Sequence, residues 1–283
     1  MAFRTGIMAS AYTYYAGYAE GFKLIKKHGY DCMDFQDFMG DGFKAYALPE
    51  DEFEKMMADI KKAAADADVT VWQTHGPWRW PPRDRDEADL AERFEKMSRA
   101  IVGTRLLGCR YCVLHPMMPF GTEEDPDPEG FMRINRDFFA RLLPVAEQNG
   151  VILCLENMPM PALRLARPLE ILEFVKSFDS PWFRVCLDTG HAATLGIQPA
   201  EAVKQIGKEY LAVMHVHDNE GTRDFHWQPF EGVTDWPAFS AALKEIGFEG
   251  VISLETQVSR KLPVALREEN QIALAHKAKA IAE

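Results

Sequence analysis

The sequence predicts a single-domain (β/α)8 barrel, the TIM-barrel fold, spanning residues 1–283. Three observations support this prediction: eight short apolar runs recur along the chain, amphipathic helical patterns separate them, and polar residues close most of the runs. The spacing is regular, because His75, His115 and Glu156 follow one another at intervals of 40 and 41 residues. Such an interval holds one strand, one helix and two connections, which is the repeat of a right-handed βα unit in a parallel sheet.

The predicted strands are short and rich in Val, Ile, Leu, Cys and aromatic residues, as expected for strands that are buried on both faces. They cover residues 5–9, 32–35, 69–74, 111–115, 151–156, 183–188, 211–216 and 251–255. In a barrel all of these strands run parallel, so their carboxyl ends meet at one face of the molecule. Polar residues at the ends of different strands are therefore expected to meet there.

The predicted helices carry apolar residues on one face and charged residues on the other. The clearest apolar stripe joins Leu90, Phe94, Met97 and Ile101. Similar patterns cover residues 53–65, 131–147, 169–178, 236–246 and 263–282. Several of these helices end at a glycine, such as Gly150, where a residue with positive φ closes the helix before the next strand.

An open, doubly wound sheet is the main structural alternative to a barrel. That fold usually carries a glycine-rich phosphate-binding loop after its first strand, and the sequence has none there. The segments after four predicted strands are long, at residues 77–85, 117–130, 157–168 and 218–235. Because long loops in a compact domain are usually functional and these leave the same end of the sheet, they predict a deep pocket with a mobile rim.

The composition is that of a globular chain, with 47% hydrophobic and 27% charged residues. The formal net charge of −11 disfavours a general affinity for nucleic acid. Apolar stretches fall short of the roughly 20 residues of a membrane helix, and the first residues lack the pattern of a secretory signal. The five cysteines, an odd number, do not resemble a disulfide framework. We therefore expect a soluble, cytoplasmic protein with reduced thiols.

Three carboxylates close apolar strands, at Glu156, Asp188 and Glu255, and His215 closes the strand between the last two. Burying a carboxylate costs free energy unless a positive group neutralises it. If the three converge, mutual repulsion is expected to raise the pKa of at least one, and a divalent cation would relieve it. Each acid alone is more simply a helix cap or the partner of an arginine, but four such residues at repeating strand ends indicate a metal site. Three carboxylates and one imidazole suit Mn²⁺, Mg²⁺, Co²⁺ or Zn²⁺ better than copper or an iron–sulfur cluster.

Histidine is the second signal, because six of the eight histidines fall at or just beyond predicted strand ends. Besides the strand-end ligand above, these are His75, His115, His191, His217 and His226, and we predict that all five bind substrate. For His217, simple packing in the core is an equal alternative. His191 stands three residues after Asp188, where it can contact a substrate oxygen or a second metal ion. Trp78 and Arg223, in the loops after the third and seventh strands, complete the predicted substrate-binding residues.

In four motifs at strand ends, the chain resembles the xylose-isomerase-like barrel superfamily. The motifs are Leu-Glu-Asn at 155–157, Cys-Leu-Asp-Thr-Gly-His at 186–191, His-Val-His-Asp-Asn at 215–219 and Ser-Leu-Glu at 253–255. The superfamily includes sugar isomerases and epimerases, hydroxypyruvate isomerases, inositol-pathway enzymes and abasic-site endonucleases. The resemblance extends over nearly the whole chain, and it indicates the fold more specifically than the substrate.

For the isomerase and epimerase branch, the resemblance implies one divalent metal ion, with Mn²⁺ as the first choice, and no organic cofactor. The metal ligands would be Glu156, Asp188, His215 and Glu255. His215 is preferred to His217 because the family histidine stands three residues before an acid, here Asp218. Glu156 and Glu255 would be the catalytic residues, which move a proton next to the carbonyl of a small sugar or sugar derivative through a cis-enediolate.

The chain departs from the ketose 3-epimerases of the superfamily at Ala162, where those enzymes carry a further glutamate. This departure disfavours a free ketohexose as the substrate. We expect a small-molecule partner, with neither nucleic acid nor a membrane, and we keep a homo-oligomer open because barrels of this size often pair with a copy of themselves.

An abasic-site endonuclease with three zinc ions is the alternative function, because every type of ligand in that site has a counterpart in this chain. The matching residues are His75, His115, Asp188, His191, Asp224 and His226. The acidic net charge stands against this alternative. A non-catalytic binding protein on the same barrel is the third hypothesis.

Overall fold

The computed structural model describes residues 2–82, 84 and 86–283 and confirms the predicted barrel. Within them, eight parallel strands stand side by side in the order β7-β6-β5-β4-β3-β2-β1-β8. They are β1 (Arg4–Met8), β2 (Cys32–Phe35), β3 (Thr70–His75), β4 (Tyr111–Leu114), β5 (Ile152–Glu156), β6 (Phe183–Asp188), β7 (Leu211–His215) and β8 (Val251–Leu254). A parallel bridge between Val216 and Leu254 joins the two outer strands, so the sheet nearly closes on itself.

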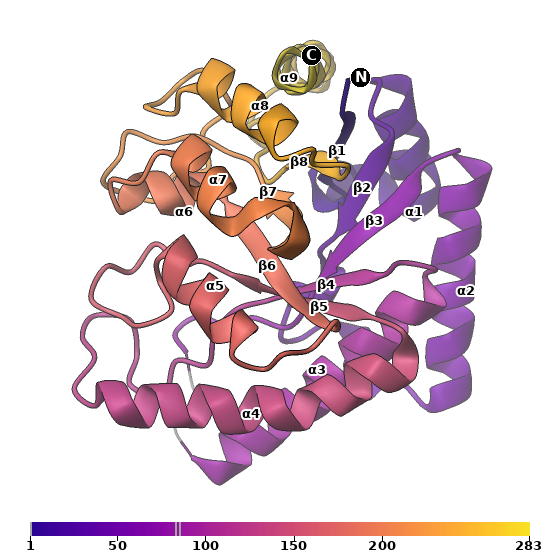
Figure 1. Ribbon diagram of the computed structural model, residues 1–283. Helices are drawn as coiled ribbons and strands as arrows, with labels where there is room; N and C mark the ends of the chain where they lie inside the picture. Colours follow the sequence, from indigo (N-terminus) through magenta and orange to yellow (C-terminus); the bar gives the residue numbers. More distant parts are fainter. Residues whose placement is uncertain (1, 83, 85) are drawn as a thin grey trace.

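Helices surround the strands (Figure 1). They are α1 (Ser10–Lys27), α2 (Glu50–Asp66), α3 (Glu87–Leu106), α4 (Pro128–Asn149), α5 (Pro168–Lys176), α6 (Thr189–Thr194), α7 (Pro199–Tyr210), α8 (Trp236–Glu245) and α9 (Val264–Ala282). Two short 3-10 helices, η1 (Asp37–Met39) and η2 (Lys44–Ala47), follow β2. Each strand is therefore connected to the next through helical structure, as a parallel barrel requires.

The predicted strands agree with the observed ones to within one residue at each end. The apolar pattern does not predict α1, α6 and α7. Helices α1 and α7 each contain a glycine, Gly17 or Gly207, whose φ of 71° interrupts the helical backbone. Helix α4 begins at Pro128, before the predicted start at residue 131, because its first turn is polar. There the Asp127 side chain accepts a hydrogen bond from the backbone N–H of Gly130 and caps the helix.

Alternate residues of a strand face opposite sides of the sheet, and β5 shows what this does for the site. Leu153 and Leu155 belong to the main hydrophobic core, whereas Cys154 packs in a separate, smaller apolar cluster. Glu156 continues the series of Cys154, so it projects from the same face of the strand. The carboxylate thus stands directly above an apolar layer.

The neighbouring strands repeat this arrangement. Cys186 on β6 and Val213 on β7 belong to the same small cluster as the interior residues of β5. Asp188 and His215 each follow two residues later, and the strand register pairs these two residues with each other. The carboxyl ends of three adjacent strands therefore place a polar layer over an apolar one.

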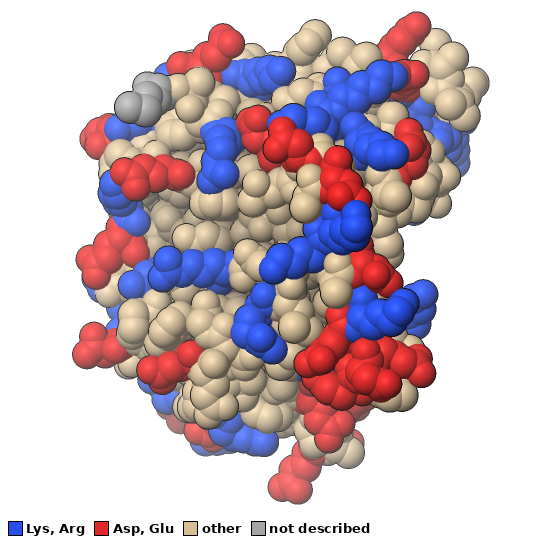
Figure 2. Space-filling model, turned by 90° about the vertical axis from the view of Figure 1, so that its right-hand side faces the viewer, with Lys and Arg blue, Asp and Glu red and all other residues tan. Residues whose placement is uncertain are grey.

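The surface carries charges of both signs. On the face shown in Figure 2, which lies on the side of α1 and α2 in Figure 1, Lys and Arg side chains are interspersed with Asp and Glu side chains. Among the helices of residues 2–82, 84 and 86–283, none has both the length and the apolar character needed to span a bilayer.

Candidate metal centre

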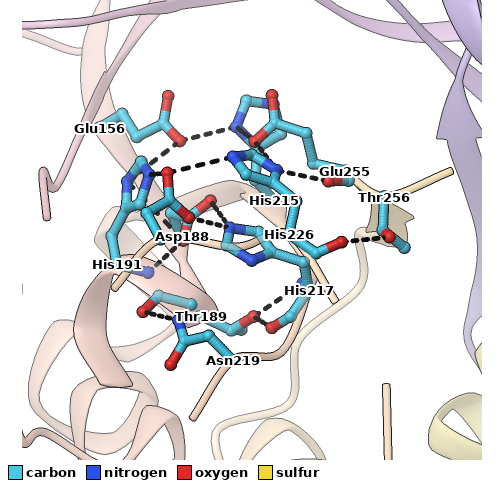
Figure 3. A network of polar contacts seen from close by, with 12 residues as sticks. Glu156, Asp188, Thr189, His191, His215, His217, Asn219, His226, Glu255 and Thr256 are labelled. Carbon is cyan, nitrogen blue, oxygen red and sulfur yellow. Dashed lines mark hydrogen bonds and ion pairs between the residues drawn. The ribbon is translucent and has the colours of Figure 1, made fainter. Parts of the chain in front are cut away.

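The four predicted metal ligands converge at the carboxyl end of the barrel (Figure 3). Glu156, Asp188 and His215 close β5, β6 and β7, and Glu255 directly follows β8. Each side chain offers one ligand atom, and these four atoms all lie within 4.8 Å of one another. All four residues are buried, so their polar atoms are largely shielded from bulk water.

His215 Nδ1 is a point of contact for both glutamates, at 2.7 Å from Glu156 Oε1 and 3.4 Å from Glu255 Oε2. Asp188 caps α6, because its Oδ1 accepts a hydrogen bond of 2.6 Å from the backbone N–H of His191. Its Oδ2 accepts a second hydrogen bond of 3.0 Å from His217 Nε2. Protein contacts therefore orient these side chains toward one another.

The donor set fits a hard divalent cation. Ligand atoms that bind an ion at 2.0–2.2 Å lie about 3–4 Å apart, so the observed group needs only a small contraction to hold one. Carboxylate oxygens with one imidazole nitrogen are ligands that such cations accept. Three buried carboxylates whose ligand oxygens lie within 4.8 Å of one another also require nearby positive charge. The residues present thus meet the chemical requirements of a divalent metal site.

Histidines surround these carboxyls, and for Glu156 and Asp188 the pKa is lowered and not raised as mutual repulsion would predict. Burial alone would raise the pKa of Glu156, but the charge of His215 and a hydrogen bond from His115 hold that pKa well below its usual range. Burial likewise acts to raise the pKa of Asp188, and the neighbouring His191 lowers it. The histidines supply positive charge of the kind that a divalent cation would also provide.

His75 and His115 lie on the Glu156 side of the group. His115 Nε2 donates to Glu156 Oε2 at 3.0 Å, and His75 Nε2 lies 3.4 Å from the same oxygen. The His75 ring is held by its Nδ1, which donates to the carbonyl of Gly76 at 2.8 Å, and it stacks on His215 with ring centroids 5.5 Å apart. Burial lowers the pKa of His115 to about 4, so this ring is neutral near pH 7.

A second group of potential ligands lies beside the first and combines three imidazoles with one carboxylate. Its members are His191, His217, Asp224 and His226. Asp224 Oδ2 accepts hydrogen bonds from His191 Nε2 at 3.2 Å and from His226 Nε2 at 3.1 Å. Burial on its own would lower the pKa of His226, but Asp224 raises it to about 9. This group therefore joins two buried imidazoles and the half-buried imidazole of His226 to an ionised carboxylate.

A cavity of about 390 Å³ opens over both groups, which is a size suited to a small ligand. It is lined by Met39, His75, Trp78, Trp80, His115, Met158, Pro159, Met160, His191, Asp224, His226 and Glu255. Trp78 packs edge-on against His115 with ring centroids 4.7 Å apart. Three of the four long segments supply seven of these twelve residues. One of the three, 77–85, includes residues 83 and 85, which lie outside the described part of the chain.

Two residues predicted to bind substrate are not part of this lining. His217 is completely buried, and its ring stacks on His226 with centroids 4.0 Å apart. Arg223 is exposed in the loop between β7 and α8. The substrate-binding roles of these two residues therefore stay predictions.

Sequence reasoning missed two residues of the site, Asp34 and Gln36. Asp34 lies in β2, and its Oδ2 accepts a hydrogen bond of 2.8 Å from His215 Nε2. Gln36 Nε2 donates to Glu255 Oε1 at 2.6 Å. The sequence does contain an indication of Asp34, because it is an acid within an otherwise apolar strand. The run of only four residues made the pattern weak.

The structure defines a parallel α/β barrel with carboxylates and imidazoles gathered at its carboxyl end. Residues 22–277 match the family model described as xylose isomerase-like TIM barrel. The chain belongs to this family.

Two curated proteins illustrate the relationship. The chain is 32% identical over 185 residues to the uncharacterized protein MJ1311 of Methanocaldococcus jannaschii, and the match covers 62% of each protein. It is 26% identical over 242 residues to the inosose isomerase of Bacillus subtilis, a match that covers 82% of this chain and 81% of that enzyme. The matched part thus falls short of two thirds of the archaeal protein and spans most of the bacterial one.

Solved structures share the whole architecture. The D-tagatose 3-epimerase-like protein superposes with a TM-score of 0.76 at 24% identity, covering 99% of this chain and 98% of that one. The IOLI protein with a bound zinc atom superposes with a TM-score of 0.75 at 22% identity, covering 98% of both chains. At these identities the likeness establishes the fold.

Proposed function

We propose that the protein is a divalent-metal-dependent isomerase or epimerase of a small sugar or sugar derivative. The observation that carries this proposal is the convergence of Glu156, Asp188, His215 and Glu255 beside a cavity of small-molecule size. The relationship to inosose isomerase supports this class of reaction. The proposed chemistry needs no organic cofactor.

In the proposed reaction, Glu156 and Glu255 exchange a proton with the carbon next to the substrate carbonyl. Glu156 directs Oε1 toward His215 and Oε2 toward His115, whereas Gln36 holds Oε1 of Glu255. One glutamate removes the proton and the other returns it, so the substrate passes through a cis-enediolate. A divalent ion, when bound, would acidify the carbon–hydrogen bond and stabilise the developing negative charge.

The cavity wall would orient the sugar. We propose that His75, His115, His191 and His226 contact its hydroxyl oxygens, because their rings line the cavity. Trp78 would limit the entry of water beside His115. His217 and Arg223 complete the proposed substrate-binding set, the first through its contact with Asp188 and the second from the exposed loop.

Mn²⁺ is the proposed ion, with Mg²⁺, Co²⁺ and Zn²⁺ as alternatives that the same donors accept. The zinc atom of the IOLI protein supports a divalent metal in a barrel of this shape. The substrate is proposed to differ from a free ketohexose, because Ala162 replaces a glutamate of the ketose 3-epimerases.

Proton exchange with solvent tests this proposal. Ketoses, aldoses and keto-inositols are incubated with the protein and Mn²⁺ in deuterium oxide, and incorporation of deuterium at carbon is measured by NMR. Glu156→Gln and Glu255→Gln are each expected to lower the exchange rate by at least about 100-fold, because each removes a group that moves the proton.

The matched control is Glu173→Gln, which alters an exposed glutamate on α5 and is expected to leave the rate unchanged. Retained exchange in either active-site variant, with the fold intact by circular dichroism, would contradict the assignment.

A zinc-dependent phosphodiesterase is the second candidate, and the number of ligand groups favours it. A third group, made of His75, Glu156 and His215, shares Glu156 and His215 with the first, so the described residues offer ligands for more than one ion. The two candidates differ in measurable ways. One ion per chain and deuterium exchange support the isomerase, whereas three zinc ions and cleavage of a duplex with an abasic site support the phosphodiesterase.

A further inference from the structure

Asp34 is a buried carboxylate that the proposed reaction does not use. It lies in β2, is 1% exposed, and its Oδ2 accepts a hydrogen bond of 2.8 Å from His215 Nε2. Two amides hold the same oxygen in place, because Gln73 Nε2 and Gln36 Nε2 lie 3.3 and 3.4 Å from it. Asp34 is thus fixed against the ring of a proposed metal ligand from the side opposite the other ligands.

The two ring nitrogens of His215 face different partners. Nδ1 points at Glu156 Oε1 and Glu255 Oε2, the group proposed to hold the ion, and Nε2 points at Asp34. A neutral imidazole carries one proton, and an ionised carboxylate can only accept it. In this structure both ring nitrogens donate, Nδ1 to Glu156 Oε1 and Nε2 to Asp34 Oδ2. Because Asp34 would keep the proton on Nε2, Nδ1 is the nitrogen that would release its proton and offer its lone pair to a divalent cation.

Other histidines of the site are oriented differently, by backbone carbonyls at Nδ1. His75 donates from Nδ1 to Gly76 O at 2.8 Å, and His191 donates from Nδ1 to Asn157 O at 2.8 Å. Their Nε2 atoms are then the ones that face carboxylates. His215 has the reverse orientation, so a dedicated acceptor for its Nε2–H is required, and Asp34 provides it.

Gln36 performs a related task for Glu255. Its Nε2 donates to Glu255 Oε1 at 2.6 Å, and the other oxygen of that carboxylate, Oε2, lies on the side of His215 Nδ1. Because an amide N–H cannot accept, this contact distinguishes the two carboxylate oxygens. Strand β2 and the residue after it thus orient two ligands that come from β7 and β8.

We propose that Asp34 is a positioning residue that sets the tautomer and ring orientation of His215 for a divalent cation, and that Gln36 positions Glu255 in the same way. The inference rests on the metal site of the proposed function. Partners of this kind typically change metal affinity by 10–100-fold when they are removed. A purely structural role would change the stability of the fold and leave metal affinity unaltered.

Cobalt binding tests the inference, since Co²⁺ reports both affinity and ligand geometry through its visible spectrum. The purified chain is stripped with a chelator and titrated with Co²⁺ against a chromophoric competitor. Asp34→Ala is expected to weaken binding by about 10–100-fold and to shift the visible absorption. Asp34→Asn, which keeps the shape but loses the charge, is expected to weaken it by at least about threefold.

Asp37→Asn is the matched control, because this carboxylate lies in η1, its Oδ2 accepts from the hydroxyl of Tyr18, and it belongs to none of the groups of potential ligands. It is expected to bind Co²⁺ as the unchanged protein does. Thermal melts of the stripped variants measure the structural contribution separately. If Asp34→Ala fails to fold, Asp34→Asn decides the question.

The outcomes separate the two proposals. Tight binding of Co²⁺ by the unchanged protein, with binding by folded Asp34→Asn within twofold and an unchanged spectrum, would overturn the role of Asp34 and leave the proposed function standing. Failure of the unchanged protein to bind Co²⁺, Mn²⁺ or Zn²⁺ would overturn the proposed function and the positioning role together.

Discussion

The two groups of potential ligands differ in what holds them. Glu156, Asp188 and His215 end three adjacent strands, and their side chains are at most 1% exposed. In the second group, Asp224 and His226 belong to the loop between β7 and α8, with side chains 25% and 40% exposed. The strand-borne group is therefore positioned by the barrel itself. In the second group His191 and His217 are buried, whereas the loop-borne pair, Asp224 and His226, is positioned by local contacts.

Those local contacts are specific. His226 has a φ of 50°, and its Nδ1 donates to Glu255 O at 2.7 Å while its own carbonyl accepts from Thr256 Oγ1 at 2.6 Å. Asp218 and Trp227 form an antiparallel bridge at the base of the loop. Hydrogen bonds thus connect the loop to the residues that follow β8, and the loop conformation is stabilised by only a few such bonds. We therefore expect a change in the loop to disturb the strand-borne group little, and a change in the strand-borne group to disturb the loop more.

The largest effect is expected from His215→Ala, which removes the shared contact of the strand-borne group. Removal of a residue that only hydrogen-bonds to a metal ligand typically lowers metal affinity by up to roughly 100-fold. Because His215→Ala removes a ligand, affinity for Mn²⁺ or Co²⁺ should fall by more than this. Calorimetric titration of the stripped protein measures this. His226→Ala, the loop-borne control, should retain tight binding of one ion, and equal losses in the two variants would show that the groups are not distinct.

A smaller effect is expected from pH, acting on the loop-borne pair. With Asp224 as its partner, His226 has a pKa of about 9, above the ordinary 6.5. Its ion pair therefore stabilises the fold fully below about pH 6.5, and this contribution is lost as the pH rises through 9. Because the imidazole is 40% exposed, solvent screening limits the contribution to about 1 kcal/mol or less.

Urea unfolding between pH 6 and pH 10, with a chelator present, measures this dependence. His226→Gln should flatten the decline, because the titrating ring is gone. If the variant loses stability with pH as steeply as the unchanged protein, other groups cause the loss. The loop-borne pair would then not differ from the strand-borne group in its pH dependence.

The smallest effect on the fold is expected from Arg223→Ala. Because this side chain is exposed, the free energy of unfolding should change by less than about 0.5 kcal/mol, and metal affinity should stay the same. If Arg223 binds substrate as proposed, KM rises once a substrate is known, and kcat changes less. A loss of kcat with constant KM would instead place Arg223 close to the reacting atoms.

Much of the site follows from strand periodicity. Glu156, Asp188 and His215 each stand at a strand end, and a two-residue alternation puts all three on the interior face once the strands are parallel. Helix boundaries were less predictable where glycine interrupts the apolar period, as at Gly17 and Gly207. Local patterns therefore determined the strands and helices, and they determined that the polar residues lie at the carboxyl ends of the strands.

The sequence by itself determined the barrel, the order of its strands and the carboxylates and histidines at their ends, because these depend on local alternation and on parallel pairing of successive units. Only the tertiary structure decided which atoms meet. Asp34 and His215 are 181 residues apart in sequence, and their contact arises only when the sheet closes. The burial of His217 behind His226 and the exposure of Arg223 also depend on how the loops fold back. Side-chain orientation at a site built from distant strands is set by packing between them, which no local pattern records.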